Sequence, residues 1–555
     1  MRARYSGWGG GLLLALLFLA LAWATLGAYG ITCDEPENFL SGDLYLRFFF
    51  TADQRWLQFE TLKNAWAGAS EKPFFYIYTF ARQERYPPVA NLVSAFTGWL
   101  LNERLGWADP IVAHHAAVPL FGALGVLVTF LFAWQSRRQL VPALVAGLAL
   151  ALFPLYWGHT HNNIKDIPMA ALFGATLWAS WRAWGEGAPR WRWAVLAGAL
   201  WGLALGTKAN GWLIPPIVIV WLAVIWVWPR FRAQGAGRIW KNVLFTGLIA
   251  GVVGGVVLLL IWPYLWADPL RRLYAVLRYF VGVGKGHPVF FEGQTYLAGQ
   301  TLPWRYAITY VLLTMPLVTL VLAGMGLVRA GRETWRGENT ASALWLIWLG
   351  ITLGRVSLPG AVIYDGLRQI MELLPVLCLM AGLGGEWLWT SIVKRLGRPR
   401  WLGLAGGLLV GLWVVLQIVT LARLHPYEGA FFNALAGGPA GASGRYTLEY
   451  WGQSYKDGAT WLNQHAGEHS WVAVAGCGHL ARFYLRSDLH LKITERAGDL
   501  AGMGGEGYVM FMHNYGGCRN PDALQAYCEM HCSPVYTLRA GGAAILSIYR
   551  WQASS

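Results

Sequence analysis

Long apolar runs separated by short polar segments make up most of the chain before residue 425. About 20 apolar residues, at a rise of about 1.5 Å each, allow a helix to cross the ~30 Å hydrocarbon core of a bilayer. We count roughly eleven such runs, and the pattern therefore predicts a mainly α-helical, polytopic membrane protein. Their approximate ranges are 11–30, 111–133, 140–157, 167–184, 193–206, 211–228, 242–263, 306–328, 341–357, 370–391 and 402–421.

Polar residues return after His425, and the stretch 437–441 is rich in turn-forming residues. Short helical and strand patterns alternate beyond it, which predicts a small α/β domain of about 100 residues. The expected helices are 455–464, 479–485 and 521–528, and the expected strands are 471–475, 508–513, 535–538 and 544–549. We therefore divide the chain into a transmembrane module, residues 1–424, and an extracytoplasmic α/β domain, residues 425–555.

Basic residues indicate the orientation of the runs, because cytoplasmic loops carry an excess of Lys and Arg. Here they cluster before the first run and in alternate loops after it. The clusters are Arg2 and Arg4; Arg137 and Arg138; Arg190 and Arg192; Arg230, Arg232, Arg238 and Lys241; Arg329, Arg332 and Arg336; and Lys394, Arg395, Arg398 and Arg400. An odd number of runs then places the C-terminal domain on the periplasmic or extracellular side, opposite a cytoplasmic N-terminus. We expect a multi-pass protein of the cell inner, or plasma, membrane.

The first loop on the external side is long, covering about residues 31–110. Within it, the segments 38–50 and 54–66 mix aromatic and polar residues, as does 270–280 in a later external loop. Such segments are typical of amphipathic helices that lie in the plane of the membrane surface. A protein that brings a lipid-borne substrate to a soluble one needs segments of this kind.

Composition agrees with a membrane protein, since 56% of the residues are hydrophobic, 13% are charged and the mean hydropathy is +0.39. Soluble domains carry about 25% charged residues. The formal net charge of +15 does not indicate a nucleic-acid partner, because the basic residues lie in short clusters between apolar runs. The chain has no Walker loop, dinucleotide fingerprint or G-x-S-x-G elbow. No nucleotide cofactor is therefore expected, and the energy for any reaction must arrive with the substrate.

An acidic pair, Asp34-Glu35, directly follows the first apolar run. A carboxylate held where a helix meets water can act as a general base that takes a proton from an attacking hydroxyl. Partial burial would raise the pKa of such a group toward a useful range. The alternative is a polar cap that ends the helix. We place Asp34 at the centre of a candidate active site.

A second polar cluster, His159–Pro168, lies between two apolar runs on the same side as the acidic pair. Its final proline suits the first turn of the next helix, which places Asp166 near a helix N-terminus. Asp166 could orient an acceptor or bind a divalent metal cation, with His159 and His161 as further ligands. The alternative is a helix cap in a hydrated loop. Polar residues at this depth are costly and are usually functional.

Basic residues on the external side depart from the positive-inside pattern. Lys208 lies between two runs, and Arg355 and Arg368 lie in another external segment. An anionic lipid phosphate would account for such cations. The alternative is that they snorkel toward water or pair with Asp365 or Glu372.

Four of the six cysteines fall after residue 470, which indicates an oxidising compartment for the C-terminal domain. Cys518, Cys528 and Cys532 lie close together in the chain, beside His531. They could form one disulfide, remain free thiols or bind zinc, although their spacing is not that of a C-x-x-C pair. The spacing does not decide how these three and Cys477 pair.

Several of these segments resemble, in their order and placement, the membrane glycosyltransferases of the GT-C fold. They are Asp34-Glu35 after the first run, the Pro87-Pro88 turn, and Asn163 with Lys165–Pro168. The resemblance is to the dolichyl-phosphate-mannose protein mannosyltransferase-like family, which includes bacterial aminoarabinose transferases, and it covers about residues 10–460. The segments 425–433 and 450–456 are also similar to stretches of bacterial members.

The resemblance implies a polyprenyl-phosphate-linked hexosyl or pentosyl donor, reached from the membrane, and inverting transfer to an acceptor protein, lipid or glycan on the external side. It implies that Asp34 is the catalytic base beside Glu35, and that Asp166 is a second acid near the acceptor or a metal. The sequence departs from relatives directly before the two prolines, at Tyr86, and after Arg368, at Gln369. The candidate residues for the donor phosphate are Lys165, Lys208, Arg368 and Arg85.

A transporter or flippase of a lipid-linked sugar is the main alternative function, and a non-catalytic scaffold is a third hypothesis. A transporter should have related halves and ionisable residues near the middle of the membrane. Here the halves do not repeat, and the polar clusters lie at one face. The enzyme hypothesis makes one spatial prediction: Asp34 and Asp166 share a pocket just above the outer leaflet, with basic side chains facing them.

Overall fold

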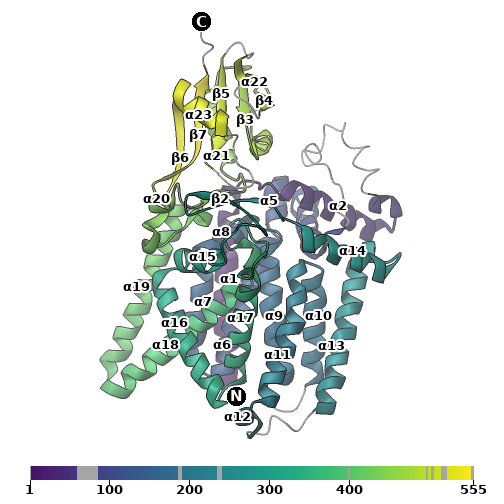
Figure 1. The fold of residues 1–555 in the computed structure, drawn as a ribbon, viewed down its shortest axis with the longest axis vertical. Coiled ribbons are helices and arrows are strands. Elements are labelled where there is room, and N and C mark those ends of the chain that lie inside the picture. The colour runs from purple at the N-terminus through teal and green to yellow at the C-terminus, as the bar shows by residue number, and fades with distance from the viewer. Residues whose placement is uncertain are drawn as a thin grey trace.

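The computed structural model describes residues 2–58, 85–185, 190–233, 240–397, 399–494, 498–501, 506–513 and 522–551. Figure 1 shows a bundle of long helices with a smaller, sheet-containing domain at one end. The N-terminus lies near the end of the bundle that is opposite this domain (Figure 1). The mainly α-helical fold class with a C-terminal α/β domain is therefore confirmed.

The helices of the bundle follow the apolar runs of the sequence. They are α1 (Arg2–Thr25), α6 (Val118–Arg137), α7 (Leu140–Ala151), α8 (Pro154–Asn162), α9 (Asp166–Trp184), α10 (Trp191–Leu205), α11 (Ile214–Val227), α13 (Trp240–Ile261), α15 (Tyr306–Thr314), α16 (Leu317–Arg336), α17 (Thr340–Val356), α18 (Leu373–Leu396) and α19 (Arg400–Leu424). In the described part of the chain, six helices are long and apolar enough to cross a membrane, and the pair α7–α8, bent by 56°, adds a seventh if it is one span. Helices α10 and α17 are apolar but shorter. The protein is a multi-pass membrane protein, while the count of eleven spans stays a prediction.

Close packing in the bundle depends on glycine where helices cross. A Cβ atom on Gly326 of α16 would overlap the carbonyl oxygen of Met380 in α18, and a Cβ atom on Gly384 of α18 would overlap that of Leu322. Small residues let helix backbones approach, and such packing holds helices together in lipid, where burial of apolar surface gives little preference for protein over lipid. The resulting bundle is a frame for the polar segments at its ends.

Two of the predicted surface helices lie at the end of the bundle that carries the α/β domain (Figure 1). Helix α2 (Glu35–Thr51) covers the predicted segment 38–50, and α14 (Pro269–Gly282) covers 270–280. In the third predicted segment, 54–66, the residues beyond 58 lie outside the described part of the chain. These helices place polar and aromatic side chains around one end of the bundle.

The loop after α14 forms a hairpin that the sequence analysis did not predict. Strand β1 (Pro288–Phe291) pairs with β2 (Gln294–Leu297) in antiparallel register. Phe291 also forms a β-bridge with Tyr446, which lies in the segment leading into the α/β domain. Each strand has only 4 residues, which is too short for a clear alternating pattern. The hairpin ties a loop of the membrane module to the C-terminal part of the chain.

The C-terminal domain is built around a five-stranded sheet in the order β4-β3-β5-β7-β6. β3 runs parallel to β4 and β5, whereas β7 runs antiparallel to β5 and β6. β3 and β5 are buried along their whole length, which is typical of inner strands covered on both faces. The elements are β3 (Trp471–Val474), β4 (His490–Ile493), β5 (Gly507–Met512), β6 (Ser533–Ala540), β7 (Ala543–Trp551), α21 (Tyr455–His465), α22 (Gly498–Ala501) and α23 (Asp522–His531).

Several features of this domain differ from the prediction. The segment predicted as a helix over 479–485 is the 3-10 helix η12 (Gly478–Phe483). The turn-rich stretch 437–441 forms a short helix, α20 (Gly438–Ala442), with its proline in the first turn. Strand β4 was not predicted, because this edge strand has only 4 residues, which is too short for a clear alternating pattern.

A disulfide joins the membrane module to the C-terminal domain. It links Cys33 to Cys477, 444 residues further along the chain. Three alternatives were left open for the later cysteines. Cys528 and Cys532 are free thiols, while Cys518 lies outside the described residues. A zinc site finds no support, since no cluster of His, Cys, Asp or Glu in the described residues could hold a metal. Sequence spacing could not indicate this pairing, because the tertiary fold brings the two cysteines together.

Candidate functional site

A cavity of about 590 Å³ lies where the helix bundle meets the C-terminal domain, and residues of both line it. Asp34 and Asp166, from segments far apart in the chain, are both among them. Three of the four predicted phosphate-binding residues also line this cavity, namely Lys165, Lys208 and Arg368. The structure thus brings both predicted acids and three of the predicted phosphate-binding side chains to one space.

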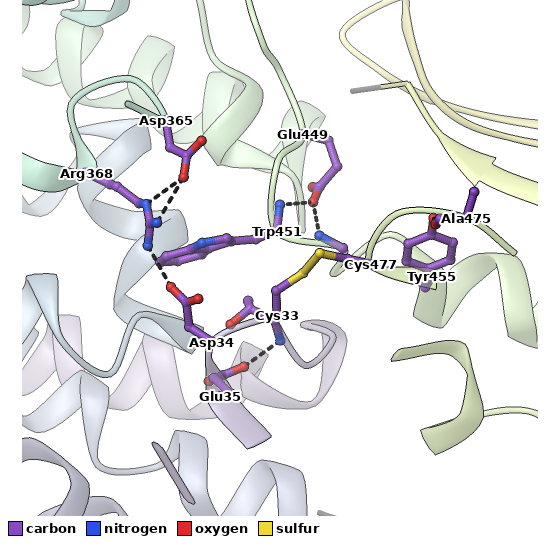
Figure 2. The surroundings of a disulfide bond; sticks show 12 residues. Cys33, Asp34, Glu35, Asp365, Arg368, Glu449, Trp451, Tyr455, Ala475 and Cys477 are labelled. Carbon is purple, nitrogen blue, oxygen red and sulfur yellow. Dashed lines mark hydrogen bonds and ion pairs between the residues drawn. A yellow bond between two sulfur atoms is a disulfide. The ribbon is translucent and has the colours of Figure 1, made fainter. Parts of the chain in front are cut away.

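Asp34 occupies the N-cap position of α2, directly after the disulfide-bonded Cys33. Its side chain makes no capping hydrogen bond, although Asp is a favoured cap residue. Instead, Oδ2 of Asp34 lies 2.8 Å from Nη1 of Arg368, and 53% of the Asp34 side chain is exposed. A simple cap therefore does not describe Asp34, whose carboxylate faces Arg368 at the cavity (Figure 2).

Glu35 differs sharply from its neighbour because it is fully buried. Its Oε2 accepts a hydrogen bond from the backbone N–H of Thr32 at 2.7 Å, and its Oε1 lies 2.9 Å from Nε2 of His115. Burial raises the pKa of Glu35, and the contacts with His115 and Thr32 oppose this shift. The two adjacent acids are therefore not equivalent: Glu35 supports the turn, and Asp34 remains accessible.

Asp166 is buried in the first turn of α9 and is held by its neighbours. Nδ2 of Asn163 donates to Oδ2 of Asp166 at 3.0 Å, and Oδ1 of Asn163 accepts from the backbone N–H of Asp166 at 2.8 Å. Oδ1 of Asp166 pairs with the ammonium group of Lys208. Asn163 thus accepts a hydrogen bond from a backbone N–H at the start of α9. The carboxylate of Asp166 holds Lys208 at the cavity.

The Pro-Pro segment lines the cavity through Tyr86 and Pro87, and not through Arg85. Nζ of Lys165 donates to the backbone carbonyl of Pro87 at 2.9 Å. Burial lowers the pKa of Lys165 to about 7, with the charge of Asp166 opposing the shift. Arg85, although predicted as a phosphate ligand, is not among the residues that line the cavity, whereas Pro87 is. Three basic side chains of the cavity, rather than four, remain candidates for a phosphate.

Arg368 lies between two carboxylates and an indole ring (Figure 2). Besides its contact with Asp34, its Nη2 and Nε lie 2.9 and 3.0 Å from Oδ2 of Asp365. Its Cζ lies 4.5 Å from the centre of the Trp451 ring, and only 11% of the side chain is exposed. Pairing with Asp365, the alternative considered for this residue, is therefore present. It holds the guanidinium at the cavity rather than removing it from there.

Arg355, the other arginine predicted to lie on the external side, also lines the cavity. Its Nη2 lies 3.3 Å from Oε1 of the buried Glu372, which also accepts a hydrogen bond from Nδ2 of Asn210 at 2.8 Å. For Arg355 the structural alternative, a pair with Glu372, is thus realised. This pair joins the start of α18 to the end of α17.

The residues suggested as metal ligands do not form a metal site. Nδ1 of His159 lies 2.9 Å from Nδ2 of Asn163, and its Nε2 lies 2.8 Å from Oη of Tyr450. Both ring nitrogens of His161 also contact protein oxygens, each at 2.9 Å. In the part of the chain that the structure describes, no group of His, Cys, Asp or Glu could hold a metal ion. The divalent cation considered for Asp166 therefore has no support, and Lys208 takes the place beside this carboxylate.

Five further residues of the site had no predicted role. The cavity is also lined by Tyr450, Trp451 and Cys477, and by two residues earlier in the chain, His287 and Tyr364. Tyr450 and Trp451 belong to a segment similar to bacterial family members, but nothing in its spacing indicates a contact with Arg368. An aromatic pair ahead of a glycine turn was the only available signal.

A buried carboxylate holds the backbone of this aromatic segment. Oε1 of Glu449 accepts hydrogen bonds from the backbone N–H groups of Trp451 and Gly452, at 3.0 and 2.7 Å. Burial raises the pKa of Glu449 to about 7, and the backbone bonds partly oppose the shift. Trp451 is therefore positioned by a group that titrates near neutral pH.

Replacing Glu449 with Gln should remove a pH-dependent loss of stability. The pKa of Glu449 rises from its ordinary 4.5 to about 7 on folding. Its contribution to the free energy of unfolding is therefore complete below pH 4.5 and is lost as the pH rises through 7. At about 1.4 kcal/mol per pKa unit, the loss amounts to roughly 3 kcal/mol above pH 8. The amide oxygen of Gln can still accept both backbone bonds. We expect the thermal midpoint in detergent to fall less steeply between pH 5 and 8 for Glu449→Gln than for the wild type; parallel curves would contradict this.

The sequence model of the dolichyl-phosphate-mannose-protein mannosyltransferase family matches residues 111–262. This range contains the His159–Pro168 segment and Lys208. A search of curated proteins finds no match. The family match therefore covers the segments that carry Asp166 and its partner Lys208, and not the segment of Asp34.

Solved structures extend the likeness to nearly the whole chain. Two structures of ArnT from Cupriavidus metallidurans match over 97% of this chain and 98% of theirs; the apo form is 16% identical with a TM-score of 0.51, and the form bound to undecaprenyl phosphate is 17% identical with a TM-score of 0.50. The chain has the GT-C fold. The oligosaccharyltransferase AglB from Archaeoglobus fulgidus, in complex with an inhibitory peptide and a dolichol-phosphate, is 14% identical, with a TM-score of 0.50 over 92% of this chain and 69% of that one.

These matches confirm the resemblance to the membrane glycosyltransferases of the GT-C fold that the sequence indicated. Because the match to ArnT extends over nearly the whole length of both chains, it includes the C-terminal domain as well as the bundle. At such low identities the likeness establishes the fold.

Proposed function

We propose that this protein is an integral-membrane glycosyltransferase that transfers a sugar from a polyprenyl-phosphate donor to an acceptor on the external face of the membrane. The observation that carries the proposal is the composition of one cavity of about 590 Å³. It holds a half-exposed carboxylate, Asp34, together with three basic side chains, Lys165, Lys208 and Arg368. A base and a cationic site for an anionic leaving group are the two components that such a transfer needs.

The lipid-phosphate donor is supported from two sides. The family whose model matches residues 111–262 takes its name from a dolichyl-phosphate-linked sugar donor. One of the ArnT structures is bound to undecaprenyl phosphate. In this chain, Lys208 and Lys165 come from loops between bundle helices and reach the same cavity. These ammonium groups could bind the oxygens of a lipid phosphate that lies at the surface of the bundle, because a Lys binds phosphate as a point charge.

The proposed reaction is a direct displacement at the anomeric carbon. Asp34 takes the proton of the acceptor hydroxyl as its oxygen forms a bond to the anomeric carbon. The bond between this carbon and the phosphate oxygen breaks with its electron pair, through an oxocarbenium-like state, and leaves polyprenyl phosphate. Lys165, Lys208 and Arg368 stabilise the charge that develops on the leaving group. One displacement from the opposite face inverts the anomeric centre.

Asp166 has a supporting role in this scheme. It is almost completely buried and paired with Lys208, so it is poorly placed to act as a second base. Its charge balances and holds an ammonium group that would face the phosphate. Glu35 is likewise buried and holds the turn before α2. The proposal therefore assigns the proton transfer to Asp34 alone.

The external location of the site is supported by the disulfide. Helix α2, which begins directly after Asp34, and the C-terminal domain lie at one end of the bundle, and the N-terminus lies near the other (Figure 1). The Cys33–Cys477 bond belongs in an oxidising compartment, such as the periplasm or the exterior. This agrees with the orientation inferred from the basic loops, with the cytoplasm at the other end. We place the protein in the cell inner, or plasma, membrane.

The transfer itself provides the test of this proposal. Purified protein in lipid vesicles is supplied with synthetic polyprenyl-phosphate hexoses and pentoses and with hydroxyl-bearing protein, lipid and glycan acceptors. We expect release of polyprenyl phosphate to accompany the appearance of labelled acceptor. The rival function, a transporter or flippase, predicts movement of the labelled lipid between leaflets with no release of polyprenyl phosphate, and that result would overturn the proposal.

A further inference from the structure

The disulfide ends directly beside the candidate base. Cys33 precedes Asp34 in the chain, and its partner Cys477 belongs to the segment between β3 and η12 of the C-terminal domain. Both cysteines line the cavity. Figure 2 shows the disulfide near Asp34, with the ring of Trp451 extending toward Arg368. Residues 29–34, between the first helices, form neither helix nor strand. This short segment is therefore tied to a part of the chain that lies 444 residues away.

Noncovalent contacts reinforce the same connection. The backbone N–H of Cys33 donates to the carbonyl oxygen of Trp451 at 2.9 Å. The backbone N–H of Ile31 donates to Oη of Tyr484 at 2.7 Å. The ammonium group of Lys456 donates to the carbonyl oxygen of Gly27. The segment that leads to Asp34 is thus bound by C-terminal residues along its length and not at a single point.

Trp451 extends the connection to the cation that faces Asp34. Its carbonyl oxygen binds Cys33, its N–H binds Glu449, and its ring lies 4.5 Å from Cζ of Arg368. Arg368 in turn lies 2.8 Å from Asp34. The contacts therefore form a closed ring, from Asp34 through Cys33 and Trp451 to Arg368 and back. A shift of the C-terminal segment would move the base and the cation relative to each other.

We infer that the C-terminal domain is a positioning part of the active site, and that the Cys33–Cys477 disulfide holds Asp34 at its working distance from Arg368. The inference rests on the proposed glycosyl transfer. Lys165 and Lys208 are held by the bundle, through Pro87 and Asp166. Arg368 contacts Trp451 of the C-terminal domain, but it is also held in the bundle by Asp365. Loss of the disulfide should therefore impair the proton-transfer step more than donor binding.

The test compares Cys33→Ser, Cys477→Ser and the double variant in the full-length protein, with Cys532→Ser as the control at a free thiol of the same domain. We expect kcat to fall by about 10- to 100-fold, since small displacements of reacting groups have effects of this size. The KM for the donor lipid should change by less than about 3-fold. The double variant should be no worse than either single variant, because both cysteines act through one bond. Cys532→Ser should match the wild type.

Reduction of the folded wild-type protein provides a second measurement, which does not depend on how the variants fold. A water-soluble phosphine converts the disulfide to two thiols and is itself oxidised to the phosphine oxide. We expect kcat to fall on reduction and to return on reoxidation, while the double variant does not respond. Mass spectrometry of a non-reduced digest should find the Cys33 and Cys477 peptides joined only in the active form.

Several outcomes would overturn the inference. It fails if the reduced protein and the double variant keep the wild-type kcat, or if the double variant loses much more activity than either single variant. It also fails if donor KM rises as much as kcat falls, because that result indicates general loss of structure. If Asp34→Asn retains transfer activity, the proposed function fails and not this inference alone.

Discussion

Replacing Asp34 with Asn should lower kcat for glycosyl transfer by about 10³-fold, within the range that general-base catalysis contributes. Asn has the same shape and can still accept a hydrogen bond from Arg368, which lies 2.8 Å away in the wild type. It cannot accept the proton of the acceptor hydroxyl. We therefore expect donor-lipid binding, measured separately, to stay within about 3-fold of the wild type while turnover is lost.

Asp53→Asn is the matched control for this variant. Asp53 is another carboxylate near α2, and it lies 2.6 Å from Nη2 of Arg55, whose side chain is 81% exposed. The control removes a charge close in sequence to Asp34 without touching the cavity, so its kcat should equal that of the wild type. A purified Asp34→Asn protein that turns over at the wild-type rate would eliminate Asp34 as the base and the reaction scheme built on it.

The placement of Asp34 and Asp166 at one end of the bundle could be predicted from sequence because each adjoins an apolar run. The side of the membrane on which a segment emerges follows from counting such runs and from the basic clusters between them. Helices α2 and α14 were predictable for a related reason, since their mixed aromatic and polar composition covers a whole helix. These features depend on local pattern, and a single sequence contains that information.

The contacts that fix the site depend instead on tertiary packing. Nothing near Cys33 indicates that its partner lies 444 residues away in another domain. Asp34 and Glu35 differ because Glu35 is buried, in contact with His115 of a different helix, whereas Asp34 lies at the cavity. His159 resembled a metal ligand until both of its ring nitrogens proved to be engaged, one of them by Tyr450. Spacing cannot separate such roles, because they are decided by what packs against each side chain.

Arg368→Gln should produce the second large effect, a fall in kcat/KM of about 10²- to 10³-fold, comparable to removal of one donor from an oxyanion site. Arg368 is the basic residue that contacts Asp34 directly, and it is held by Asp365 and the ring of Trp451. Its loss removes charge from the leaving-group side and leaves Asp365 without its guanidinium partner. We expect the KM for the donor lipid to rise and kcat to fall together, which distinguishes this variant from Asp34→Asn.

Arg305→Gln is the control for this loss of charge. Arg305 lies 2.6 Å from Glu292 and its Cζ is 5.9 Å from the Phe291 ring, so it shares the carboxylate and aromatic contacts of Arg368 but lies outside the cavity lining. Its variant should keep both kinetic constants. Arg368→Lys should recover part of the donor affinity, because a Lys keeps the charge but cannot contact Asp34 and Asp365 with a planar, multidentate group. If Arg368→Gln changes neither constant, the leaving phosphate does not lie on this side of the cavity, and Lys165 and Lys208 alone must hold it.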